Sequence, residues 1–189
     1  MKNIFKKSIS ILLTLLILIS IVPTSVVTYA GDTVDSGDGI TWSIDGETLV
    51  VGGSGEVTIT LTNEWYDAIW DKCVNIIVEE GITSIGEGAF SELIILEKVE
   101  ILGEITKIGE WAFFGCPKLK EINIPDSVTV IGDRAFGNCS SLEPINIPEN
   151  ILEIGEWAFE NCSGLKNWDV VLPDTIQKIS LGAFSGTSI

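Results

Sequence analysis

The most regular feature of the chain is a pattern of apolar positions that recurs at a fixed interval. Isoleucine, glycine, alanine and phenylalanine keep their places in the segments SIGEGAF, KIGEWAF, VIGDRAF and EIGEWAF, which end at Phe90, Phe113, Phe136 and Phe159 and so define a 23-residue period. An altered copy, KISLGAF, ends at Phe184, two positions later than this period requires. A fixed period in this range predicts a solenoid, in which each repeat buries its apolar face only against neighbouring repeats.

Within each repeat the pattern predicts a strand, a turn and a short helical segment. Residues 121–124 alternate polar and apolar side chains, as a strand with one buried face does. The chain then turns at 131–132, and apolar residues follow at helical spacing over 135–139. Because the strands recur in one direction with a crossover between them, they are expected to pair as a parallel sheet. The phenylalanine column is expected to form the spine of the core.

A small β-rich cap is expected at residues 42–72, because a stack of repeats cannot begin with its core open to water. Its three tryptophans, Trp42, Trp65 and Trp70, are expected to pack over the first repeat, and an aromatic ligand platform is the alternative. The elements of this cap are a hairpin of 42–44 and 49–51 around Asp45-Gly46, a strand at 57–61 and a helical turn at 65–70.

The segment 1–30 is predicted to be a signal peptide. Three lysines precede an apolar run over residues 9–22, and the small residues Thr28 and Ala30 suit cleavage after Ala30. An uncleaved membrane anchor is the alternative. Residues 31–41 are acidic and glycine-rich and are expected to form a flexible leader. The mature protein is therefore expected outside the cell, secreted or at the cell surface.

Composition narrows the range of functions. The 189 residues, 46% of them hydrophobic, suffice for one cored domain. Three of the 11 basic residues lie within the segment 1–30, so the chain from Gly31 onward has 8 basic and 27 acidic residues and a net charge of −19. Such a surface repels nucleic acids and anionic membranes. Histidine is absent, which removes histidine-dependent nucleophiles and metal sites. We therefore expect no enzyme activity and no cofactor.

The combined pattern I-x-x-I-G-x-x-A-F-x-x-C-x-x-L-x-x-I-x-I-P resembles the BspA-type leucine-rich repeat from Cys73 to Ile189. The segment ITWSIDGETLVVGGSGEV is also similar to the hairpin that precedes such repeats in secreted bacterial proteins. The resemblance implies an α/β repeat solenoid: a right-handed, leucine-rich-repeat-like stack of parallel strands with short helices. About five repeats of the period given above would occupy 73–189. It further implies adhesion or protein binding, with no catalytic residues to carry over.

Three cysteines, Cys116, Cys139 and Cys162, occupy one column of the repeat. Disulfides between adjacent repeats fit the permitted distances, and export favours them. Side chains in a parallel ladder point the same way, however, and the equivalent earlier residues are Trp70 and Leu93. These thiols are therefore predicted to be buried and free.

An acidic column follows the isoleucine-glycine pair in each repeat. Paired carboxylates at this spacing suggest a glycosidase or a calcium site. A solvated face at a helix N-terminus explains the same pattern without chemistry, and this explanation is preferred. The column consists of Glu87, Glu110, Asp133 and Glu156.

Two tryptophans, Trp111 and Trp157, stand where other repeats have Gly88, Arg134 and Gly182. Because a core position rarely accepts arginine, both are predicted to be partly exposed. They are candidates for stacking on sugars or for contacting a protein, and the structural alternative is a rim position where each indole covers the neighbouring helix.

The outward positions of the predicted strands form the broadest candidate binding surface. The expected partner is an extracellular protein, on the host matrix or a neighbouring cell, and a polysaccharide is the alternative. Self-association through the C-terminal repeat is a third possibility, since an uncapped repeat exposes apolar surface and a strand edge. The candidate strand residues are Lys98, Glu100, Glu121, Asn123 and Asn146.

Overall fold

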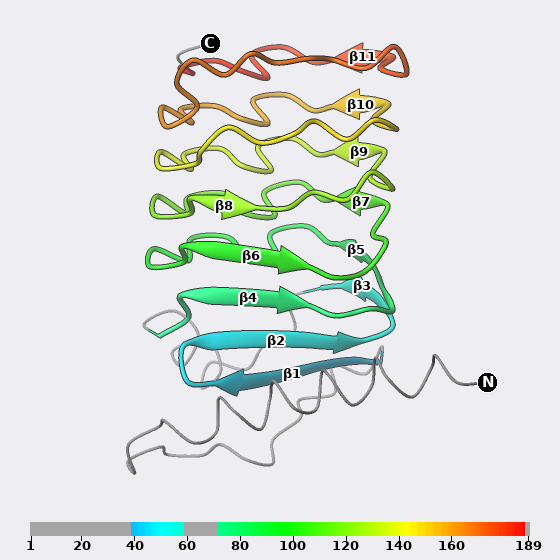
Figure 1. Ribbon diagram of the computed structural model, residues 1–189, viewed down its shortest axis with the longest axis vertical. Coiled ribbons are helices and arrows are strands. Elements are labelled where there is room, and N and C mark those ends of the chain that lie inside the picture. Colours follow the sequence, from blue (N-terminus) through cyan, green and yellow to red (C-terminus); the bar gives the residue numbers. More distant parts are fainter. Residues whose placement is uncertain (1–38, 59–71, 188–189) are drawn as a thin grey trace, which may run out of the picture. The chain divides into compact units, whose positions relative to one another are not determined.

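A computed structural model shows a stack of coils whose strands lie in two ladders (Figure 1). It describes residues 39–58 and 72–187. These residues belong to a unit spanning Gly31–Ile189, and a separate unit spans Met1–Ala30. The predicted signal peptide, residues 31–38 of the leader and the segment with Trp65 and Trp70 lie outside the described residues. We number the five coils by the phenylalanine they carry, from Phe90 in coil 1 to Phe184 in coil 5.

The first sheet begins with the predicted hairpin. β1 and β2 pair antiparallel, with Trp42 opposite Val51 and Asp45 opposite Thr48, which confirms the turn expected from Asp45-Gly46. β2 then pairs parallel with β4, so this hairpin continues directly into the sheet of the repeats. The order is β1 (Ile40–Asp45), β2 (Thr48–Gly53), β4 (Asn75–Val78), β6 (Lys98–Ile101), β8 (Glu121–Ile122).

A second parallel sheet occupies the position where the sequence predicted only a turn. Its strands run opposite to β2, β4, β6 and β8 of the first sheet in Figure 1, so coils 1–3 each cross from one sheet to the other. Ile108 pairs with Ile85 and with Ile131, which places the isoleucine of each isoleucine-glycine pair in this ladder. The order is β11 (Lys178–Ile179), β10 (Glu153–Ile154), β9 (Val130–Ile131), β7 (Lys107–Ile108), β5 (Ile82–Ile85), β3 (Gly55–Val57).

The expected short helices are wrong: the described part of the chain contains strands and turns but no helix. The reason is the backbone of the segment that ends in each phenylalanine. Trp111 has φ 58° and Gly115 has φ 70°, and the equivalent pairs in the other coils are also positive, whereas a right-handed helix needs φ near −63° throughout. The N–H groups of Trp111, Phe113 and Gly115 instead donate to carbonyls of the next coil at 2.8–2.9 Å.

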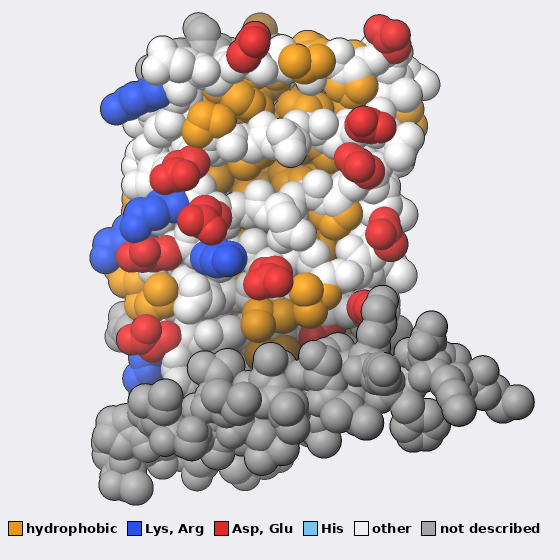
Figure 2. All heavy atoms as spheres, in the orientation of Figure 1, with side chains coloured by type: hydrophobic (Ala, Val, Ile, Leu, Met, Phe, Trp, Pro, Cys, Tyr) orange, Lys and Arg blue, Asp and Glu red, His pale blue; other side chains and the backbone are white. Residues whose placement is uncertain are grey.

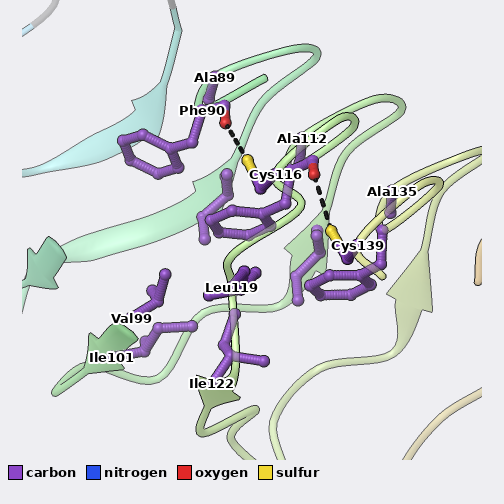
Figure 3. Packing of buried hydrophobic residues seen from close by; sticks show 14 of the residues in the cluster. Ala89, Phe90, Val99, Ile101, Ala112, Cys116, Leu119, Ile122, Ala135 and Cys139 are labelled. Atoms are coloured by element: carbon purple, nitrogen blue, oxygen red, sulfur yellow. Dashed lines mark hydrogen bonds between the residues drawn. The ribbon is translucent and has the colours of Figure 1, made fainter. Parts of the chain in front are cut away.

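The phenylalanine column is the spine of the core, as predicted. The rings of Phe113, Phe136 and Phe159 are fully buried and nearly parallel, with centroids 5.4 and 5.2 Å apart. Figure 3 shows the rings of this column stacked one above the other beside the aliphatic side chains of the first sheet. Trp42 covers the N-terminal end of the column, its ring 6.1 Å from that of Phe90. Trp168 packs edge-on against the other end, on Phe159 and Phe184.

Adjacent coils approach so closely at one column that only glycine fits. A Cβ atom on Gly132 would lie 2.6 Å from the nitrogen of Glu110, and one on Gly155 would lie 2.5 Å from that of Asp133. The fifth position of this column is Ser180, whose buried hydroxyl has no hydrogen-bond partner among the described residues. The last coil thus departs from the packing of the others.

Candidate binding surface

Five of the seven predicted surface residues meet in one hollow on the outer face of the first sheet. This first hollow has a volume of about 580 Å³ and extends across coils 2–4. The outward side chains of β6, β8 and the segment 143–146 converge there, and parallel pairing places Lys98 opposite Glu121. The five predicted residues that line it are Lys98, Glu100, Glu121, Asn123 and Asn146.

The edge of this hollow carries charges of both signs. Lys98 and Glu121 lie 3.8 Å apart, and Lys120 donates to Glu97 at 2.9 Å. This hydrogen bond lowers the pKa of Glu97 and raises the pKa of Lys120. All four side chains remain substantially exposed, so their charges are available to a partner.

Asn123 has a structural role that sequence reasoning missed. Its side-chain oxygen accepts the N–H of Ile101 and its amide donates to the carbonyl of Ile101, both at 2.8 Å. The side chain thereby takes the place of backbone ladder bonds, and β8 ends at Ile122, two residues earlier in the repeat than β6. Asn146 stands one repeat later, and both asparagines are exposed, but only the side chain of Asn123 is held by hydrogen bonds to Ile101.

Trp111 and Trp157 form a separate feature with Arg134 between them. The guanidinium of Arg134 lies 5.3 Å from the ring centroid of Trp111 and 4.7 Å from that of Trp157. It also donates to Glu160 at 2.7 Å. A guanidinium over an indole face is attracted by the ring electrons, so these three side chains stabilise the stack of coils. Positions 111, 134 and 157 are equivalent in successive repeats, and this spacing is the feature of the sequence from which the contact could have been predicted.

This stacking limits what the two tryptophans can bind. Trp111 is 38% exposed, and Trp157 is half-buried, which confirms the prediction of partial exposure. The faces that the two rings turn towards each other are occupied by Arg134, and the ring of Trp157 also covers Gly182. Two tryptophans in line are therefore not a free platform for a sugar chain.

The three cysteines of the repeat column are buried and free, and so is Cys73. The thiol of Cys116 donates to the carbonyl of Phe90 at 3.2 Å, and that of Cys139 donates to Phe113 at 3.1 Å (Figure 3). Burial raises the pKa to about 11 for Cys73 and to about 12 for Cys116 and Cys162, and raises that of Cys139 well above its usual range. The prediction of buried core thiols is confirmed.

The acidic column lies at the surface, where Asp133 accepts the backbone N–H of Glu156 at 2.6 Å. Among residues 39–58 and 72–187, no group of three or more cysteine or acidic side chains is placed to hold a metal ion. The same residues include no helix long and apolar enough to cross a membrane. Glu87, Glu110 and Glu156 are exposed, as a solvated face requires, although the helix ends that were expected beside the column do not form.

The two ladders, the phenylalanine spine and the hollow outer face define a leucine-rich-repeat type of solenoid. The chain belongs to the BspA-type leucine-rich repeat family, whose model, described as BspA type Leucine rich repeat region, matches residues 65–189 in six copies. Residues 65–71 of this match lie outside the described residues. No curated protein matches the chain.

Solved structures of bacterial proteins share this fold. A leucine-rich repeat protein of T. pallidum has a TM-score of 0.59 and 25% identity, covering 78% of this chain and 64% of that one. A leucine-rich cell surface protein of Faecalibacterium prausnitzii has a TM-score of 0.60 and 25% identity, covering 79% and 45%. A leucine-rich repeat protein of Eubacterium ventriosum, at 24% identity and a TM-score of 0.57, covers 62% and 32%. The chain thus spans less than two thirds of each of these proteins.

Proposed function

We propose that this protein is a non-catalytic binding module of the cell surface or extracellular space that recognises a protein partner through the first hollow. One observation carries the proposal: side chains from three coils converge in a single hollow of mixed charge over a fully buried core. Rigid repeats behind an extended surface are the usual arrangement for recognition in solenoids.

The proposed location rests on two supports. The segment 1–30 has the composition of a signal peptide, and the related protein of Faecalibacterium prausnitzii is a cell surface protein. Expression in a secreting bacterial host should release a chain that begins at Gly31, as read by N-terminal sequencing. A chain that keeps Met1 and stays with the membrane would instead support the anchor alternative.

A binding screen with paired variants tests the function. The purified protein is passed over immobilised extracellular matrix proteins and polysaccharides, and the double variant Lys98→Ala/Glu121→Ala is compared with Glu153→Ala/Lys178→Ala. Each variant removes one exposed lysine-glutamate pair and leaves the net charge unchanged, but the second pair lies between β10 and β11 on the other sheet. We expect only the first variant to lose a protein ligand.

Two outcomes would contradict this proposal. Equal weakening by both double variants would show that the first hollow is not the contact surface. A polysaccharide ligand that is lost in Trp111→Ala, but kept in the Lys98→Ala/Glu121→Ala variant, would move recognition to the tryptophan column. Asn123 is left unchanged in these variants because its side chain holds the backbone of Ile101.

Self-association is a second candidate, favoured by the exposed apolar side chains of coil 5. Leu181 is 72% exposed and Ile179 is 44% exposed. β11 pairs on one side with β10 and has no other strand partner among the described residues. Such an edge pairs readily with another chain, so sedimentation velocity should show a dimer that Leu181→Ser weakens. A monomer at every concentration would contradict this candidate.

A further inference from the structure

A second hollow lies beside the first on the same face and differs from it in chemistry. Its volume is about 700 Å³, and it extends across coils 3–5. Pro144, Ile145 and Asn146 line both hollows, so the two form one continuous depression. Of the outward strand positions that the sequence predicts, only Pro144 and Asn146 belong to the second hollow.

The floor of the second hollow is apolar and firmly held. Trp168 is 8% exposed, and its indole N–H donates to the carbonyl of Ile145 at 2.8 Å. Its ring packs edge-on against Phe159 and Phe184, which ties the floor to the core. Val171 rises from the same hollow and is 77% exposed, the largest exposed fraction among the large apolar side chains that the structure describes. The hollow thus offers a rigid apolar base and one uncovered apolar side chain.

Backbone groups in this hollow lack the partners that the repeat gives them elsewhere. The first sheet ends at β8, and residues 144–147 and 167–172 follow the same path without forming a ladder. The N–H groups of Ile145, Asn146 and Ile147 have no hydrogen-bond partner among the described residues. Free backbone groups bond to water or to an added extended segment.

The side walls of the hollow are acidic. Four carboxylates line it, from Asp126, Glu149, Asp169 and Asp174, and no lysine or arginine does. The ion pairs between described residues involve none of these four groups. Figure 2 shows basic side chains only on the side of this face where β4 and β6 begin, whereas the opposite side carries acidic side chains. The field at this hollow therefore favours a cation.

We propose that the second hollow binds an extended segment of a partner protein that carries lysine or arginine next to a small apolar residue. The cationic side chain lies against the four carboxylates, and the apolar one covers Val171. Charge complementarity selects this occupant, because an acidic segment would be repelled by every charged group in the hollow. The inference rests on the proposed function and names the chemistry of the partner.

Fluorescence anisotropy with labelled ten-residue peptides tests this assignment on the full protein. The probe alternates lysine with valine, one comparison peptide replaces lysine by glutamate, and another replaces valine by serine. The protein variant Asp169→Asn/Asp174→Asn is paired with Glu87→Gln/Glu110→Gln, which removes the same charge from the acidic column of another face. Because the first variant removes two of the four carboxylates that line the hollow, we expect it to weaken binding about tenfold and the second variant to weaken it less than twofold.

Each outcome decides the question. Binding of the lysine-valine peptide alone, with the difference between the two variants, supports the assignment. Equal weakening by both variants means attraction by net charge and overturns it, and so does equal binding of the lysine-serine peptide or no binding of any peptide. If a protein ligand from the screen depends on Lys98 and Glu121 while no peptide binds, the inference fails and the proposed function stands.

Discussion

Replacing Phe136 by alanine should be far more damaging than replacing Phe184. Phe136 is fully buried and lies between Phe113 and Phe159, at centroid distances of 5.4 and 5.2 Å. Truncating a buried phenylalanine costs about 3–5 kcal/mol, and each aromatic pair contributes about 0.5–1.5 kcal/mol beyond burial. Because Phe136→Ala removes two stacked pairs, its cost should lie near the upper end of that range, at about 4–5 kcal/mol.

Phe184 has a different environment. Its ring is half-buried and stacks on one phenylalanine, Phe159, at 5.4 Å, with the edge of Trp168 at 5.9 Å. A terminal coil of a solenoid can also open without disturbing the coils before it. We therefore expect Phe184→Ala to cost about 2 kcal/mol, with much of the change confined to the last coil.

Urea denaturation followed by far-ultraviolet circular dichroism measures both losses. Phe136→Leu is the matched control, since leucine keeps much of the buried volume and should recover more than half of the lost stability. At about 2–4 °C per kcal/mol for a domain of this size, the melting temperature of Phe136→Ala should fall by about 8–20 °C. Equal losses for the two alanine variants would refute the view that the stacked column carries the cooperativity of the fold.

Three further predictions concern the contacts between coils. Gly132→Ala should prevent folding or cost more than about 2 kcal/mol, because its Cβ would lie 2.6 Å from backbone; a melting curve like that of the parent would contradict this. Arg134→Ala should cost about 1–3 kcal/mol in urea, and Arg134→Lys should recover only the part due to Glu160, because lysine lacks the planar group that stacks on indole; full recovery would contradict it. The buried thiols of Cys116 and Cys162 keep their protons up to a pKa of about 12, whereas the unfolded chain loses them near 9. The free energy of unfolding should therefore decrease as the pH rises from 9 to 12. The decrease should be smaller in the variant Cys116→Ala/Cys162→Ala, and the urea midpoint measured at each pH checks this.

Much of the fold could be predicted from the sequence because the same residue types recur at the same positions of each repeat. A single isoleucine such as Ile122 says little, but the same residue type at the same place in successive repeats identifies a buried column. The hairpin at Asp45-Gly46 was predictable for another reason, since that dipeptide fits few other turns. Both inferences depend on short-range rules that tertiary contacts do not override.

The two differences between expectation and structure have separate physical causes. Two-residue strands such as Val130–Ile131 are too short to show alternation, so the sequence indicates only a turn where the second sheet lies. The spacing of Ala135, Phe136 and Cys139 is typical of a helix, but Arg134 at φ 51° and Asn138 at φ 63° break the required backbone. Glycine at 88, 115, 182 and 186 was the available warning, because it fills the same two columns.

The sequence predicts which residues face outward on the candidate surface, but it does not predict the hollows that they line. Alternation along the strand indicated that Lys98 and Glu100 point outward, and they do. It could not show that Asn123 bonds to backbone while Asn146 does not, since both occupy one column. The second hollow could not be predicted from the sequence either. Ile145 and Trp168 keep the apolar pattern of the strands, but the segments that contain them do not pair as strands.

The first sheet does not extend into coils 4 and 5, and this has a consequence for where the chain accommodates extra residues. Between Phe159 and Phe184 the repeat is two residues longer, yet Phe159 still donates to Ala183 at 2.7 Å and Ile154 still pairs with Ile179. The extra residues are accommodated on the side of the coil that carries no inter-coil ladder. In this coil the added length and the second hollow therefore lie on the same face of the molecule, and the second sheet keeps its pairing.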